Sequence, residues 1–180
     1  KKKFNIKKNF KKNSFDYVLF LAGITPQSKY INNKKCEFGN LDYQNFLKIV
    51  TVNCYANIKI FEILKKKKLL KNNARIVFFS SLAGSIEKRG KLIHNKPFGN
   101  IFYRISKSAL NSGVKNLSYD FNEKYIIVSM HPGFVKTKSG GSKADYSINY
   151  AVNKIYKTII NLKNNDNGKF LNLNGKKIKW

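Results

Sequence analysis

Short apolar runs alternate along this chain with longer segments of helical periodicity. The runs are bounded by Gly, Pro, Ser or Asn and are typical of buried parallel strands; they span residues 15–24, 74–81, 125–130 and 169–173. Between them, apolar residues recur every three or four positions, which predicts helices at residues 42–70, 101–122 and 148–162. Strand and helix therefore alternate, and we expect an α/β domain: a Rossmann-like, doubly wound parallel sheet with helices on both faces.

Small or rigid residues follow three of the predicted strands, in the segments Ala22-Gly23, Ser81-x-x-Gly84 and Pro132-Gly133. The carboxyl ends of parallel strands meet at one edge of a sheet, and ligands of such sheets bind beyond that edge. We therefore expect the three segments to converge on one binding site.

Length and composition agree with one globular domain, since 180 residues with 42% hydrophobic residues can form a proper core. No apolar run reaches the ~18 residues of a membrane span, and the start, KKKFNIKKNF, lacks the apolar segment of a secretory signal. Two cysteines are too few for a disulfide framework or a zinc site, so we expect a reducing cytoplasm and no metal. The chain does not begin with Met, and we expect a fragment or a processed product.

The net charge of +27 raises the question of nucleic-acid binding. Only three of the 36 basic residues are Arg, whereas specific nucleic-acid readers rely on bidentate Arg. The lysines are spread along the chain, and the 24 asparagines beside them are what an A+T-rich coding sequence produces. Compositional drift on solvated faces therefore explains the charge better than a nucleic-acid partner does.

Tyr-x-x-x-Lys is the pattern with candidate chemistry, because on a helix the two side chains share one face. A nearby ammonium favours phenolate, and lowering a tyrosine pKa from about 10 by roughly 2–3 units takes about 3–4 kcal/mol. Lysine is so frequent here that chance pairs are expected, and the pattern occurs four times, at Tyr30/Lys34, Tyr55/Lys59, Tyr103/Lys107 and Tyr150/Lys154. Only Tyr103/Lys107 opens a helix between a Ser-terminated strand and a Pro-Gly-terminated one, so we assign the chemistry to this pair.

With these features in this order, the sequence resembles a short-chain dehydrogenase/reductase. The matching segments are L-A-G-I at residues 21–24, Asn53 in the long helix, S-S-L-A-G at 80–84, Y-R-I-S-K at 103–107 and H-P-G-F-V-K-T at 131–137. YRISKSALN, HPGFVKTKSGG and the ending GKFLNLNGKKIKW are similar to the C-factor-like branch of carbonyl reductases. The resemblance covers nearly all of the chain from Phe15 onward.

The resemblance implies a role for each matching residue. Tyr103 would be the general acid/base, Lys107 would lower its pKa and hold the nicotinamide ribose, and Ser81 would stabilise the substrate oxygen. Asn53 would hold a water that links Lys107 to solvent. The residues implied to bind NAD or NADP, with NADP slightly favoured, are Ala22, Gly23, Tyr103, Lys107, Pro132, Gly133, Val135 and Thr137. Ser80, His94 and His131 are not expected to be catalytic.

The chain departs from the family pattern in one important way, because it contains no T-G-x-x-x-G-x-G. That glycine-rich turn and the helix after it normally hold the cofactor's pyrophosphate. We therefore expect a single partial domain, in which residues 1–14 are a connector and 15–180 are the catalytic half, with the first βαβαβ half of the sheet missing.

The first functional hypothesis is an NAD(P)-dependent carbonyl reductase or alcohol dehydrogenase, with a small-molecule substrate and, at full length, a homodimer or homotetramer. Two alternatives stay open at this point. One is a non-catalytic remnant that acts as an interaction piece, and the other, less favoured, is a basic nucleic-acid-binding module.

Overall fold

The computed structural model describes residues 10–26, 28–29, 31–90, 100–137 and 140–180. Its strands are β1 (Phe15–Phe20), β2 (Leu70–Phe79), β3 (Tyr125–His131) and β4 (Phe170–Asn172). Its α-helices are α1 (Tyr43–Val50), α2 (Ala56–Lys66), α3 (Ile101–Asp120) and α4 (Ile148–Ile160). Single helical turns lie at Asn33–Cys36, Leu82–Gly84 and Asn164–Asp166.

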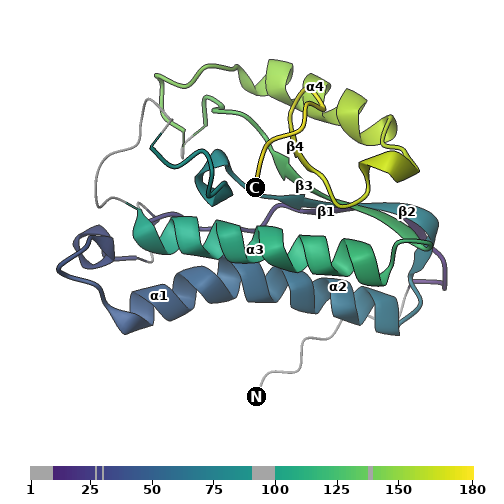
Figure 1. The fold of residues 1–180 in the computed structure, drawn as a ribbon, viewed down its shortest axis with the longest axis horizontal. Helices are drawn as coiled ribbons and strands as arrows, with labels where there is room; N and C mark the ends of the chain where they lie inside the picture. The colour runs from purple at the N-terminus through teal and green to yellow at the C-terminus, as the bar shows by residue number, and fades with distance from the viewer. Residues whose placement is uncertain (1–9, 27, 30, 91–99, 138–139) are drawn as a thin grey trace.

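The four strands form one parallel sheet in the order β1-β2-β3-β4, with Phe20 opposite Phe78 and Val77 opposite Val128. Helices α1, α2 and α3 cover one face of this sheet, and α4 covers the other (Figure 1). This arrangement confirms the predicted α/β class, with a parallel sheet and helices on both faces.

Each face of the sheet has its own core. Successive side chains of a strand point to opposite faces, so Ile76 and Phe78 of β2 pack toward α2 and α3, in one cluster with Phe61. Val77 packs on the other side, with Ile159 of α4. A strand buried on both faces reads as a continuous apolar run, which is why I-V-F-F was recognisable as a central strand.

The face of β1 that lies toward α4 is only partly covered. Tyr17 and Leu19 are each 42% exposed there, whereas the alternate residue Phe20 is buried on the opposite face. On α4, Val152 and Tyr156 are also more than half exposed. Among the described residues, no strand pairs with the second edge of β1. β1 and α4 therefore form the two walls of an apolar trough.

The end of β1 and the start of β2 each differ from the prediction by four residues, and the other strand boundaries lie within two residues of it. β1 ends at Phe20 instead of residue 24, because side chains of the long helix hydrogen-bond the backbone of Ala22 and Ile24. β2 begins at Leu70, where Leu70 pairs with Phe15 and an irregular register follows. The polar residues 71–73 hid this extension of the strand from the sequence pattern.

The predicted helix over residues 42–70 is α1 and α2 joined by one π-helical turn at Thr51–Tyr55. The Asp42 carboxylate caps its start by accepting a hydrogen bond from the Asn45 amide at 2.8 Å. The helix ends at Lys66, and Lys68 takes a left-handed conformation (φ 56°) before β2. π-Turns are rare and frequent at functional sites, and this one carries Asn53.

Candidate active site

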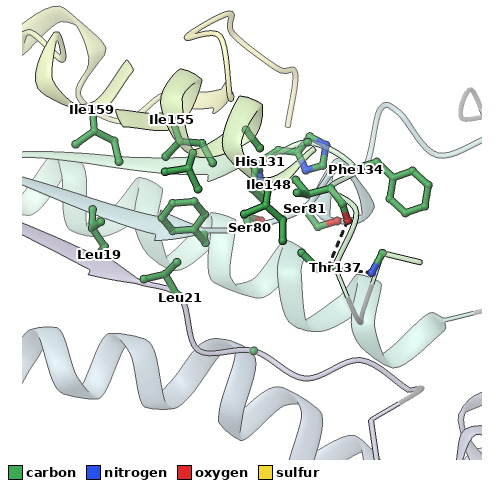
Figure 2. A pocket seen from close by; sticks show the side chains of 18 of the residues that line it. Leu19, Leu21, Ser80, Ser81, His131, Phe134, Thr137, Ile148, Ile155 and Ile159 are labelled. Atoms are coloured by element: carbon green, nitrogen blue, oxygen red, sulfur yellow. Dashed lines mark hydrogen bonds between the residues drawn. The ribbon is translucent and has the colours of Figure 1, made fainter. Parts of the chain in front are cut away.

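A cleft of about 1050 Å³ opens at the carboxyl ends of β1, β2 and β3 and continues into the trough between β1 and α4. Figure 2 shows Ile155 and Ile159 on one side of it, Leu19 and Leu21 on the other, and Ser81 and Thr137 at one end. The polar end is lined by the strand-end segments and by α3, through Gly23, Ser80, Ser81, Tyr103, Lys107, His131, Pro132, Gly133, Val135 and Thr137. The three strand-end segments converge as expected.

Ser81, Tyr103 and Lys107 meet in this polar end. Ser81 and Tyr103 both line this end of the cleft, and Ser81 Oγ accepts a hydrogen bond from the Ala83 amide at 3.2 Å. Lys107 is 5% exposed; its ammonium donates to the Phe79 carbonyl at 2.8 Å and lies 5.9 Å from the centre of the Tyr103 ring. The neighbouring Ser80 also lines the cleft, and its hydroxyl is buried without a partner among the described residues.

The electrostatics of the pair differ from the expectation. Burial raises the pKa of Tyr103 above its ordinary value, and the hydrogen bond from Ser81 only partly offsets this. The expected lowering by Lys107 is absent, because its ammonium is directed at the Phe79 carbonyl rather than at the phenol. Burial also lowers the pKa of Lys107 to about 8. In this state the phenol is protonated at pH 7.

Asn53 lies behind the cleft wall, where it is fully buried. Its Oδ1 accepts from the Ile24 amide at 2.7 Å, and its Nδ2 donates to the Ile24 carbonyl at 2.9 Å and to Ser106 Oγ at 3.0 Å. The Asn53 side chain thus connects the segment after β1 to α3, where it bonds Ser106, the residue before Lys107. A Cβ at Gly23 would lie 3.4 Å from Lys107 Nζ and 3.5 Å from Asn53 Oδ1, so Gly23 borders both groups.

Asn57 is a supporting residue that the sequence analysis missed. It is 2% exposed, and its Nδ2 donates to the Ala22 carbonyl at 3.3 Å and to the Val52 carbonyl at 2.9 Å. Ala22 is therefore held by a hydrogen bond from the long helix. It does not line the cleft, whereas the other residues expected to bind the cofactor do. In a chain with 24 asparagines, nothing in the sequence distinguished this one.

His131 lines the cleft, and burial lowers its pKa to about 4, so it is neutral at pH 7. His94 lies outside the described residues. Within the described ranges, no cluster of His, Cys, Asp or Glu could hold a metal ion. No helix in those ranges has the length and apolar character needed to cross a membrane.

Gly133 closes the cleft after β3 with a positive φ of 86°, and a Cβ there would lie 2.4 Å from Leu173 Cδ2 and 2.9 Å from Tyr146 Cδ2. We expect Gly133→Ala to lower the free energy of unfolding by about 2–4 kcal/mol, from left-handed strain and overpacking. Gly141→Ala is the control, because φ is 76° but a Cβ would meet none of the described atoms within 4 Å. Urea denaturation measures both, and equal losses would show that the contacts at Gly133 are unimportant.

A parallel sheet with helices on both faces and a cleft at the carboxyl ends of its strands defines a Rossmann-like fold. Residues 5–163 match the family described as Enoyl-(Acyl carrier protein) reductase, which is a short-chain dehydrogenase/reductase family. The chain belongs to the short-chain dehydrogenase/reductases.

Individual relatives agree with this. The chain is 27% identical to C-signal of Myxococcus xanthus over 146 residues. This alignment covers 81% of this chain and 84% of that protein. Carbonyl reductase Sniffer of D. melanogaster superposes with a TM-score of 0.76 at 29% identity, over 93% of this chain and 67% of that one. The NADPH-bound carbonyl reductase from chicken fatty liver superposes with a TM-score of 0.71 at 27% identity, over 90% of this chain and 64% of that one.

The chain is shorter than most of these proteins. It spans only 39% to 50% of the length of several other curated oxidoreductases that it matches.

Proposed function

We propose that the protein is an NAD(P)-dependent oxidoreductase that interconverts a small carbonyl compound and its alcohol. The main support is the convergence of Ser81, Tyr103 and the buried Lys107 in one cleft at the carboxyl ends of three parallel strands. Membership of an oxidoreductase family and the likeness to an NADPH-bound carbonyl reductase support it further.

The chemistry follows from the groups that face one another. Tyr103 and Ser81 each place a hydroxyl group in the same end of the cleft, so a carbonyl oxygen that enters between them can accept a hydrogen bond from each. Tyr103 then gives its proton to that oxygen during reduction and takes it back during oxidation. Because burial keeps the phenol protonated, the site starts in the form that reduction needs. The bound NAD(P)H supplies the hydride.

The cleft fits the nicotinamide end of the cofactor better than the phosphate end. Lys107 offers a buried cation for the ribose, and Gly133, Val135 and Thr137 line the space beside it. No glycine-rich turn for the pyrophosphate occurs in the sequence. We therefore propose that residues 15–180 are the catalytic half of the domain, that 1–14 are a connector, and that a nucleotide-binding half completes the site.

The isolated 180-residue chain should then bind NADH and NADPH weakly. The pyrophosphate is the most strongly charged part of the ligand, and the elements that normally hold it are not in this sequence. Isothermal titration calorimetry measures the affinity, with a carbonyl reductase that has its complete glycine-rich turn as the positive control. A low micromolar Kd for this chain would contradict the prediction.

Activity is tested on the longest natural form of the protein that carries this chain. We expect it to oxidise NADPH or NADH in the presence of small aldehydes or ketones, followed by the loss of the reduced nicotinamide absorbance. Ser81→Ala should lower kcat by about 10²-fold, because one of two donors to the developing oxyanion is lost. Ser80→Ala, one residue earlier, is the control; a larger loss there would move the assignment to Ser80.

A further inference from the structure

The single turn Leu82–Gly84, which follows Ser81, is fastened directly to α3. The Gly84 carbonyl accepts two hydrogen bonds from α3, from Ser108 Oγ at 3.1 Å and from Asn111 Nδ2 at 3.2 Å. A Cβ on Gly84 would lie 2.9 Å from the backbone carbonyl of Lys107 and 3.0 Å from Asn111 Nδ2. Only glycine allows the turn to lie this close to the helix.

The same turn is hydrogen-bonded to Ser81, the residue that precedes it. The Gly84 amide donates to the Ser81 carbonyl at 2.8 Å, and the Ala83 amide donates to Ser81 Oγ at 3.2 Å. A shift of Gly84 therefore moves Ser81 with it. On the helix side, Asn111 lies one turn beyond Lys107 and two turns beyond Tyr103, so the contact joins the two elements that supply the Ser81–Tyr103 pair.

Packing alone does not account for Asn111. The residue is 3% exposed between α3 and the turn, and its Oδ1 has no hydrogen-bond partner among the described residues. A buried acceptor without a partner is unfavourable, and an apolar side chain of similar size would avoid it. What the amide supplies in return is the bond to the Gly84 carbonyl.

We propose that Asn111, assisted by Ser108, is a positioning residue that holds the Leu82–Gly84 turn, and with it the Ser81 hydroxyl, against Tyr103. The catalytic meaning of this role rests on the proposed function, but the geometric role does not. Neither residue lines the cleft, so each acts through Ser81 and not on a substrate.

The Tyr103 hydroxyl itself reports the position of Ser81, because the hydrogen bond from Ser81 lowers the pKa of Tyr103. The 180-residue chain is labelled with ¹³C at the tyrosine ring carbon that bears the hydroxyl, and Tyr103→Phe identifies the resonance. We expect Asn111→Leu to raise the titration midpoint by about half a unit to one unit, the size of one lost hydrogen bond. Ser81→Ala should give the same shift, and the double variant should add nothing further.

Asn116→Leu is the matched control, since Asn116 is on the same helix but exposed, and its amide bonds the Ser112 carbonyl at 3.0 Å. It should leave the midpoint unchanged. If Asn111→Leu does not fold, Ser108→Ala, which removes the other bond to Gly84, decides the question with a smaller shift in the same direction.

An unchanged Tyr103 midpoint in a folded variant would overturn the inference, and so would a shift that adds fully to that of Ser81→Ala. In an active form of the protein, Asn111→Leu should lower kcat and leave the KM for cofactor unchanged. The titration needs no turnover, so a protein without reductase activity would refute the proposed function and still leave the positioning role decided.

Discussion

Tyr103→Phe is expected to lower kcat for carbonyl reduction by about 10²–10⁴-fold, the usual contribution of a general acid. Phenylalanine keeps the ring in its place on α3 and removes only the hydroxyl group. Cofactor affinity should therefore change little. Steady-state consumption of NAD(P)H gives kcat, and calorimetry on the same preparation gives the cofactor Kd.

Two other tyrosines provide unusually close controls. Tyr150 has Lys154 Nζ 5.5 Å from its ring centre, much as Tyr103 has Lys107 at 5.9 Å, but Tyr150 is 44% exposed and far less enclosed. Tyr55, followed by Lys59, is also exposed. Tyr150→Phe and Tyr55→Phe should keep nearly full activity. Loss of activity in either one, with Tyr103→Phe active, would show that the wrong pair has been assigned.

Lys107→Met should have two opposite effects. We expect kcat to fall by about 10²-fold or more, because the cation that borders Tyr103 and the ribose position is lost. The fold should instead become more stable at pH 7 by about 1–2 kcal/mol. Removing a buried charge is favourable, and the unpaired Phe79 carbonyl offsets part of that gain. A variant that is both inactive and less stable would mean that Lys107 is structural.

The pH dependence of stability separates these effects. The folded pKa of Lys107 is about 8, below its ordinary value of 10.5, so the unfolded state binds more protons between these two values. Stability of the wild type should therefore rise as pH increases from about 8 to 10.5, by up to about 3 kcal/mol. Urea midpoints of wild type and Lys107→Met, compared across this range, should approach each other and then cross, because the gain of the wild type exceeds the advantage of the variant at pH 7. Parallel curves would exclude a depressed Lys107 pKa.

Most of the site was predictable because parallel strands direct their carboxyl ends to one edge. Ser81 follows β2, whereas Pro132 and Gly133 follow β3, and the parallel topology brings both segments to the cleft that Tyr103 lines. The direction of the Tyr103 pKa was not predictable. It depends on where the Lys107 ammonium points, and the carbonyl of Phe79, remote in sequence, decides that.

The supporting contacts were also invisible in the sequence. Asn57 donates to the Ala22 carbonyl and Asn111 donates to the Gly84 carbonyl. Every residue has a backbone carbonyl, so the sequence does not indicate which one accepts such a bond. The bonds of Asn53 and Asn57 to the backbone of Ile24 and Ala22 explain why β1 ends earlier than its apolar run. Side-chain amides replace the strand ladder after Phe20, where hydrophobicity alone predicted more strand.

The order of the strands in space is the order in which the chain presents them. Each new strand docks on the one completed just before it, through a crossover by the intervening helices, so no strand has to insert between two that are already paired. Contacts between neighbours in sequence keep the cost of loop closure low at each step. Assembly of these four strands can therefore follow the order in which the chain is synthesised.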